Sequence, residues 1–457
     1  MYDANDLERT GSDKRGRMSR RPPTQLPKGV KLYLPDEAFH KRYVEERLLG
    51  VFRQWGFREI VTPAYEYFDV LALGTDEALQ EQMFKFVDRE TGRTLALRAD
   101  ITPQIARVVA TRLRGESMPL RLAYVTNVFR YHEPRVGRYR EFYQAGVELI
   151  GLDKPEADAE MIAMAIEGLR ALGLSAFQVN VGQAEFFRGL LEELKVDRAT
   201  ARVLQEALRK KEVAELDRLL HEMAPPAATE ELLRALPTLY GRADVLERAG
   251  RLTSNPRSER ALANLAEVHR LLTVYGLADS VIVDLGEVRG FDYYSGVNFE
   301  GYVAGLGAEV CGGGRYDHLL ALFGAPLPAT GFAFDVARLL LAMEAQQVSL
   351  PMAGPDFYII DFTPDKTVAL SLSRRLRALG FAVARDIITR GLEDSIDYAR
   401  GLRARTILVV GAPQRQREEV LAIDLRTGTE RLLQLSVILD DSLATFPDAV
   451  PPGAQRG

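Results

Sequence analysis

The chain has 457 residues, of which 47% are hydrophobic and 27% charged, the proportions of an ordinary globular protein with room for about two to four domains. A net charge of −5 excludes a surface that is basic throughout, and no apolar run approaches the roughly 20 residues that cross a bilayer. Cys311 is the only cysteine, so the chain cannot close a disulfide on itself and offers no cysteine-based metal site. We therefore expect a cytoplasmic protein with no membrane segment and no metal centre.

The N-terminal part of the chain predicts a tail followed by a helix, a strand and a hairpin. Residues 1–30 are polar and rich in Arg, Lys and Pro, which is typical of a flexible tail. Apolar residues recur at helical spacing over 36–55, and a short strand follows and ends at Pro63. A hairpin is predicted over 84–98, and a helix over 102–113 with Thr102 as its N-cap.

Two long strands, 121–129 and 140–150, enclose a charged turn with the sequence VFRYHEPRVGRYREFYQ, from Val128 to Gln144. Arginines before and after such a turn suit a triphosphate, because a guanidinium offers a fixed fork of donors to phosphate oxygens. Glu133 lies in the same turn, and its charge would repel that phosphate. The turn therefore predicts a site that binds without reacting.

The remainder of the chain predicts a mixed core and a small separate domain. A helix over 155–172 and a strand over 177–181 precede a long helical stretch that proline interrupts near Pro225 and Pro237. The predicted elements that follow are strands at 281–285, 293–303 and 309–311 and a helix at 330–343. Prolines at 351–355 mark a boundary, beyond which strands and helices alternate as in a small α/β domain.

Five motifs occur in an order that resembles the catalytic core of class II aminoacyl-tRNA synthetases, specifically histidyl-tRNA synthetase. They are RADIT at 98–102, the hairpin at 130–144, GVE at 146–148, RGFDYYSG at 289–296 and CGGGRYD at 311–317. The resemblance implies an α+β fold, with an antiparallel sheet flanked by helices. It implies a core at 31–345 with a helical insertion at about 185–269, an anticodon-binding-like α/β domain at 355–436, and a tail at 437–457.

Longer phrases resemble a non-catalytic branch of that family, the regulatory subunits of ATP phosphoribosyltransferase. These phrases are TPAYEYFDVL, REFYQAGVELIG and FQVNVGQAEFFRGLL. The resemblance implies a subunit with no catalytic residue and no cofactor that joins a short-form ATP phosphoribosyltransferase catalytic subunit. Such a subunit would serve the first step of histidine biosynthesis and convey feedback inhibition by histidine. It would form a homodimer within a hetero-oligomer, through the helix at 36–55 and the strand that bears Pro63.

Departures from the synthetase pattern fall on the nucleotide side of the site. His132 replaces a glutamate that handles ATP, and Glu133 stands where the synthetase has an arginine. Asp335 occupies a position that is normally glycine, and Ala337 one that is normally acidic, whereas Arg338 is kept. A carboxylate where a nucleotide should lie takes up space and repels phosphate, so we expect no reaction with ATP.

The residues that the resemblance implies for a histidine pocket are kept, by contrast, except that Asp100 stands where the synthetase has the longer glutamate. The resemblance implies an acid, a threonine and a glutamine for the ammonium, an acid and tyrosines for the imidazole, and arginines for the carboxylate, which is sound donor and acceptor chemistry. The implied residues are Asp100, Thr102 and Gln144 for the ammonium, Glu148, Tyr294 and Tyr293 for the imidazole, and Arg130 and Arg289 for the carboxylate. Taken alone, Asp100 and Glu148 would be read as structural partners of arginines.

Two alternatives stay open. One is an active histidyl-tRNA synthetase that uses ATP and magnesium, against which the loss of glutamate at position 132 counts. The other is RNA binding by the C-terminal domain, although tRNA is not expected because the arginines there are accompanied by many acids. Those arginines are Arg375, Arg385, Arg390, Arg415 and Arg417. Glycines 312–314 are interpreted as permitting close approach of the backbone, not as a phosphate cradle.

Overall fold

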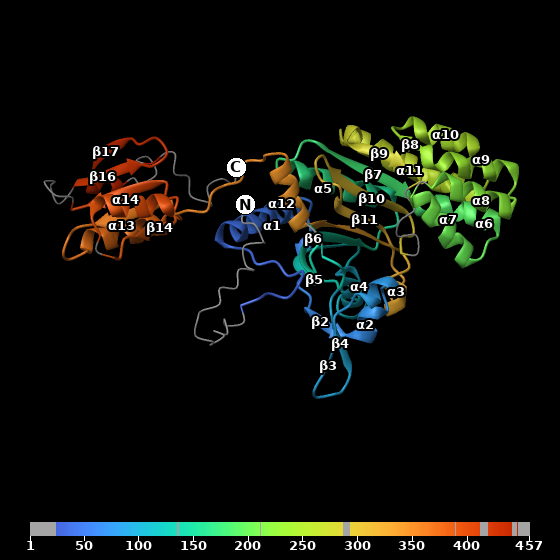
Figure 1. The fold of residues 1–457 in the computed structure, drawn as a ribbon, viewed down its shortest axis with the longest axis horizontal. Helices are drawn as coiled ribbons and strands as arrows, with labels where there is room; N and C mark the ends of the chain where they lie inside the picture. The colour runs from blue at the N-terminus through green and yellow to red at the C-terminus, as the bar shows by residue number, and fades with distance from the viewer. Residues whose placement is uncertain are drawn as a thin grey trace, which may run out of the picture. The chain divides into compact units, whose positions relative to one another are not determined.

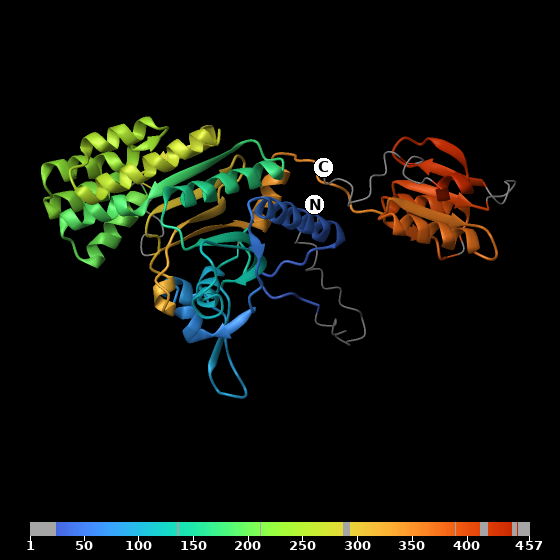
Figure 2. The same ribbon diagram turned by 180° about the vertical axis from the view of Figure 1, so that it is seen from behind.

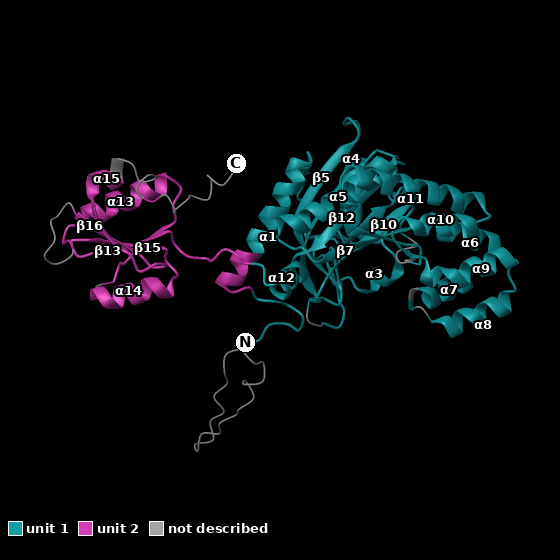
Figure 3. Cartoon of the chain, turned by 90° about the horizontal axis from the view of Figure 1, so that it is seen from above, with its two compact units in different colours: residues 1–32, 41–348 teal, residues 33–40, 349–457 magenta. Residues whose placement is uncertain are grey.

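The computed structural model describes residues 24–134, 137–210, 212–286, 293–388, 390–411, 419–440 and 446. The chain divides into two compact units (Figure 3). Unit 1 comprises Met1–Leu32 and Lys41–Val348, and unit 2 comprises Tyr33–His40 and Ser349–Gly457. Across the described residues, no helix has both the length and the apolar character needed to cross a membrane.

Unit 1 is built on a nine-stranded sheet in the order β1-β5-β6-β12-β11-β10-β7-β9-β8 (Figure 1). β1 pairs with β5 and β7 with β9 in parallel, and the other neighbours pair antiparallel, which confirms the expected α+β class. In that order the strands are Arg58–Glu59, Leu120–Phe129, Glu141–Ile150, Ala329–Asp335, Glu309–Arg315, Val297–Val303, Phe177–Gln183, Val281–Asp284 and Tyr240–Gly241.

One face of the sheet is apolar and carries two helices. Successive side chains of a strand point to opposite faces, and on this face Phe332 and Phe334 of β12 are buried. Helix α5 (Pro155–Ala171) packs closely against Phe334 and against Leu48 of α1 (Pro35–Gln54). The contact is made at Gly168, where a Cβ would lie 2.7 Å from Phe334 and 3.2 Å from Leu48. Phe52 of α1 meets Phe332 edge-on at 6.2 Å. Figures 1 and 2 show both helices along the sheet.

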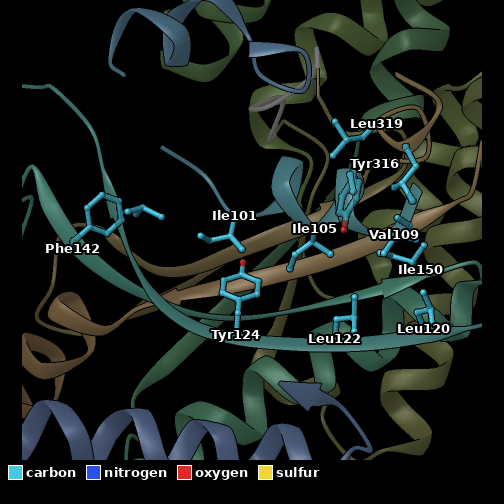
Figure 4. Packing of buried hydrophobic residues seen from close by; sticks show 14 residues of the cluster. Ile101, Ile105, Val109, Leu120, Leu122, Tyr124, Phe142, Ile150, Tyr316 and Leu319 are labelled. Carbon is cyan, nitrogen blue, oxygen red and sulfur yellow. The ribbon is translucent and has the colours of Figure 1, made fainter. Parts of the chain in front are cut away.

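The opposite face carries helix α4 (Thr102–Thr111) and the short helix η3 (Leu320–Phe323). Aliphatic side chains of α4 pack on β5 together with the rings of Tyr124 and Tyr316 (Figure 4). Ile101, not Thr102, is the N-cap of α4, because the Thr102 hydroxyl donates to Glu148 and does not cap the helix. This bond ties the start of the helix to the middle of the sheet.

The helical insertion lies between β7 and β9. Its helices are α6 (Ala184–Leu194), α7 (Arg198–Lys210), α8 (Val213–Met223), α9 (Ala227–Ala235), α10 (Asp244–Leu252) and α11 (Pro256–Val274). The interruptions fall where proline predicts them, since α8 ends ahead of Pro225 and Pro237 lies in a 3-10 turn. Helix α11 packs along α6 and α5, which joins the insertion to the core.

A three-stranded sheet, β2-β4-β3, carries the predicted hairpin. Its strands are Tyr65–Tyr67, Thr94–Leu97 and Lys85–Val87, and helices α2 (Phe68–Ala72) and α3 (Glu77–Glu81) lie between β2 and β3 along the chain. Residues 24–30 of the expected tail are among the described residues, and there the Gly29 carbonyl accepts from the Arg140 amide at 2.7 Å.

Unit 2 has a five-stranded sheet in the order β14-β13-β15-β16-β17, with helices α13 (Thr367–Ala378) and α14 (Leu392–Gly401). Its strands are Val383–Arg385, Phe357–Asp361, Thr406–Val410, Glu419–Asp424 and Glu430–Gln434. Two apolar clusters, one on each side of the sheet, include Phe357 and Tyr358, which alternate along β13. β17 was not predicted, and α15 (Leu435–Asp440) reaches into the expected tail at 437–457.

Three further sequence predictions about unit 1 differ from the structure. The helix expected at 330–343 is a strand, β12, followed by helix α12 (Val336–Ala345). The strand lies between β6 and β11 and is covered on both faces, so it lacks the alternation that would have identified it. The strand expected at 309–311 continues to Arg315, because glycines 312–314 lie inside the sheet, and the strand expected from 293 begins at Val297.

Candidate functional site

A cavity of about 930 Å³ lies on the α4 side of the large sheet. Its floor includes residues with little or no side chain on two adjacent strands, namely Gly331 and Ala333 of β12 and Gly312 of β11. Register places these positions beside one another, so the space that larger side chains would fill stays open. Polar side chains from α4, from the β5–β6 hairpin and from the segment before β10 surround it.

Glu148 is the buried carboxyl beside this floor, with 1% of its surface exposed. Its Oε1 accepts a hydrogen bond from the Thr102 hydroxyl at 2.7 Å, and its Oε2 accepts one from the Tyr316 hydroxyl. A side chain at position 331 would collide with it, since a Cβ there would lie 1.8 Å from Oε2. Burial raises the pKa of Glu148 to about 8, against the two hydroxyl donors, which lower it.

Asp100 and Arg130 form an ion pair that faces the cavity. Arg130 Nη2 lies 3.3 Å from Asp100 Oδ2, and about 30% of each side chain is exposed. The Thr102 amide donates to Asp100 Oδ1 at 3.0 Å, and Arg130 Nε donates to the Ala99 carbonyl at 2.8 Å. A guanidinium and a carboxylate are thereby held side by side with opposite charges toward the open space.

Tyrosines form a further wall. The rings of Tyr293 and Tyr294 meet edge-on at 5.3 Å, and that of Tyr293 lies 5.7 Å from that of Tyr316. Burial, and after it the charge of Asp100, raises the pKa of Tyr293 and of Tyr294, so both hydroxyls remain hydrogen-bond donors at neutral pH. Gln144 also lines the cavity, and its Oε1 has no hydrogen-bond partner within the described part of the chain.

At the end of the cavity beside β11 and the start of α12, acidic side chains line the wall and Arg338 is already engaged. Arg338 Nη1 donates to the side chain of Glu309 at 2.6 Å and to its carbonyl at 2.7 Å. Asp335 accepts from the Arg338 amide at 3.1 Å and so caps helix α12. Burial raises the pKa of Asp335 to about 6, below neutrality, so this carboxyl is mostly ionised at neutral pH. A triphosphate would therefore meet acids and a neutralised arginine there.

Two residues of the charged turn differ in their placement. His132 lines the cavity, and burial lowers its pKa, so its ring is neutral near pH 7. Glu133 does not line the cavity; it pairs with Lys28 at 3.0 Å on the surface. The acids that do line the cavity include Glu309 and Asp335.

The cavity brings together seven of the eight residues expected to form the histidine pocket. Six line it directly, and Glu148 lies next to its floor in contact with Thr102. The six are Asp100, Thr102, Arg130, Gln144, Tyr293 and Tyr294. Arg289 lies outside the described residues. Throughout the described ranges, no group of three or more His, Cys, Asp or Glu side chains is placed to hold a metal ion.

Sequence reasoning missed two tyrosines of the site. Tyr316 donates to Glu148. It belongs to the CGGGRYD motif, of which only the glycines 312–314 were given a role from the sequence. Those glycines do permit close approach, since a Cβ at Gly313 would lie 2.2 Å from the Gly331 carbonyl oxygen. Tyr124 lines the cavity from β5, opposite Gly146. It stood within a predicted strand and carried no motif of its own.

The chain is similar to proteins of known family over most of its length. The family model of histidyl-tRNA synthetase matches residues 29–339. The ATP phosphoribosyltransferase regulatory subunit of Geobacter sulfurreducens is 44% identical over 93% of this chain and 97% of its own length. The subunit of the same name from Moorella thermoacetica is 42% identical over 84% of this chain and 98% of its own length.

Solved structures of the same two kinds of protein are similar to this chain. An ATP phosphoribosyltransferase regulatory subunit/histidyl-tRNA synthetase from Bacillus halodurans superposes with a TM-score of 0.74 at 32% identity, over 84% of this chain and 98% of that chain. A histidyl-tRNA synthetase from Nostoc has a TM-score of 0.80 at 20% identity, over 92% and 99% of the two chains. The second likeness concerns the fold alone and shows a class II synthetase-like architecture.

Proposed function

From the premise that the chain belongs to the ATP phosphoribosyltransferase regulatory subunits, within the histidyl-tRNA synthetase family, we propose that its cavity binds free histidine and reports it to a catalytic partner. The chain is a regulatory subunit of ATP phosphoribosyltransferase in histidine biosynthesis, and it is not itself the catalyst. Its partner is accordingly an ATP phosphoribosyltransferase catalytic subunit, which we propose to be of the short form.

The observation that carries the histidine proposal is the pairing of Asp100 with Arg130 next to the buried Glu148. An α-amino acid carries an ammonium and a carboxylate on one carbon, and an adjacent carboxylate and guanidinium complement both groups. Glu148 and Tyr294 then provide an acceptor and a hydroxyl for two ring nitrogens. Gln144 adds a free amide oxygen for the ammonium. Arg289 remains part of the proposal as a second carboxylate ligand.

The same cavity is unsuited to a nucleotide. The ion pairs of the Arg338 guanidinium with Glu309 and Asp335 would have to break before phosphate oxygens could use it. Breaking a partly buried ion pair leaves carboxylates without a partner, which is costly. We therefore propose that the site takes histidine without activating it, with neither ATP nor metal, and that tRNA is not a ligand.

Regulation would follow if histidine binds two assembly states with different affinity, because a ligand shifts an equilibrium only by its differential affinity. We propose a homodimer within a hetero-oligomer, formed through α1 and the residues around Pro63, in the cytoplasm. In this proposal residues 31–345 form the ligand-binding core with an insertion at about 185–269, and residues 355–436 form an anticodon-binding-like domain.

Reconstitution with a short-form catalytic subunit of the same organism tests the proposal. Activity should depend on this chain, and histidine should inhibit the complex. Asp100→Asn removes the charge opposite the ammonium and should raise the inhibitory histidine concentration about tenfold or more, as loss of a charge-assisted hydrogen bond does. Asp279→Asn, at a fully exposed aspartate outside the cavity, is the matched control.

Two results would contradict the proposal. One is equal inhibition of the complexes that contain Asp100→Asn and the wild-type chain. The other is histidine-dependent exchange of pyrophosphate into ATP by this chain at an ordinary enzymatic rate, which would identify an active synthetase.

A further inference from the structure

Unit 2 contains a second cavity, of about 570 Å³, that the proposed function does not use. It lies between the segment 351–356, the loop that follows α14, and the turn that follows β16. Backbone hydrogen bonds join the three segments, from the Arg405 amide to the Pro355 carbonyl and from the Leu425 amide to the Arg405 carbonyl, each at 3.0 Å. The walls are therefore tied to one sheet of unit 2.

Arginines dominate its lining. Four surround the cavity, and Asp356 is the single acid among the described residues that line it. The carboxylate of Asp356 is engaged with the Ala382 amide at 2.8 Å. The four arginines are Arg400, Arg403, Arg405 and Arg426. The cavity thus carries an excess of positive charge, although the chain as a whole is acidic.

The arginines are not equally neutralised. Arg400 pairs with Asp397 at 2.9 Å, and Arg403 pairs with Asp36 of the same unit at 2.7 Å. Arg405 is half-buried, and it has no ion-pair partner among the residues that the structure describes. A guanidinium that has lost part of its water without gaining an acid is suited to receive an anionic ligand.

The C-terminal end of helix α14 places one of these arginines. Arg403 has a φ of +55°, a left-handed conformation that glycine adopts far more readily than arginine. Gly354 lies against it, since a Cβ at position 354 would come within 2.3 Å of the Arg403 carbonyl oxygen. This conformation ends helix α14, because the amides of Arg403 and Ala404 donate to the carbonyls of Arg400 and Ala399 at 2.9 and 3.0 Å, and it fixes the position of the Arg403 side chain at the cavity.

The rest of the lining is apolar and suits an organic group. Met352, Pro351, Pro355 and Leu425 contribute to it, and the volume is in the range of small-molecule sites. Arginine forks match phosphate oxygens in geometry as well as charge. We propose that this cavity binds a small phosphate ester, with its phosphate on the arginines and its organic part on the apolar side.

Adenosine 5′-monophosphate and ribose 5-phosphate, titrated into the full-length chain at physiological salt, are the probes, with adenosine as the phosphate-free control. Both esters should bind and adenosine should not. Arg405→Gln should weaken ester binding about tenfold or more, because it removes charge-assisted hydrogen bonds. Arg374→Gln, at an exposed arginine of α13 outside the cavity, should leave binding unchanged.

Arg426→Gln, an exposed position of the same cavity, gives a second variant if Arg405→Gln fails to fold. Two results would overturn the proposal: ester binding that is unaltered in a folded cavity variant, and absence of ester binding to the wild-type chain. A short single-stranded oligoribonucleotide distinguishes the source of the phosphate. If it binds through these arginines when neither ester does, the site is a nucleic-acid contact and the proposal is wrong.

Discussion

Replacement of Glu148 by glutamine should change how the stability of unit 1 depends on pH. The side chain is 1% exposed, and its pKa is raised from 4.5 to about 8 by burial. Glutamine keeps the shape; its carbonyl oxygen can accept from one of the two hydroxyls, of Thr102 or Tyr316, and its amide NH2 can donate to the other. It cannot ionise, so the variant removes the titration and keeps most of the packing.

The direction in which the free energy of unfolding changes with pH follows from proton linkage. A carboxyl whose pKa is higher in the folded state than in the unfolded state binds its proton more tightly when folded. Its contribution to stability is fully present below pH 4.5 and is lost as the pH rises through about 8. At 1.36 kcal/mol for each unit of pKa shift, a shift from 4.5 to about 8 gives a loss on the order of 5 kcal/mol.

Denaturant unfolding followed by the fluorescence of Trp55, the only tryptophan, measures this in unit 1. The free energy of unfolding of Glu148→Gln, relative to wild type, should increase between about pH 4.5 and about pH 8, the window set by the two pKa values, and level off above it. Glu344→Gln, at an exposed position of α12, should give a flat difference. A flat difference for Glu148→Gln would show that Glu148 is not held as a neutral carboxyl, and the reasoning would be refuted.

Three further variants test other contacts of the cavity. Gly331→Ala should destabilise unit 1 by about 2–4 kcal/mol in the same unfolding assay, because its Cβ would collide with Glu148. Tyr316→Phe removes one hydroxyl from Glu148 and should weaken histidine binding about fivefold in calorimetry; unchanged affinity would contradict that contact. Arg338→Ala should lower the unfolding free energy by about 3 kcal/mol, because it leaves Asp335 without its cation, and should create no ATP binding; ATP binding by that variant would contradict the proposed exclusion.

Local signals were sufficient for much of the fold. The hairpin β3–β4, the pair β5–β6 and the alternation of strands and helices in unit 2 depend on periodicity and turn residues, which short segments carry. Strand β12 was mistaken for a helix because it is buried on both faces. Its identity depends on its partners β6 and β11, which no local pattern reveals.

Residues of the candidate site could be predicted where they stand in a recognisable motif. They could not be predicted where their contacts depend on which strands are neighbours in the sheet. Asp100, Thr102 and Gln144 all line the cavity as expected. Tyr316 reaches Glu148 only because β11 and β6 flank β12, a relation between strands far apart in the sequence. Glu133 was misplaced for the converse reason, since its neighbours in the turn suggested a cavity residue whereas its side chain pairs with Lys28.

Calorimetric titration of the isolated full-length chain with histidine, and separately with ATP and magnesium, tests the central claim most directly. The account predicts saturable binding of one histidine per chain, weakened in Tyr294→Phe, and no binding of ATP. Binding of ATP with magnesium, or histidine binding that Tyr294→Phe and Glu148→Ala leave unaltered, would contradict it.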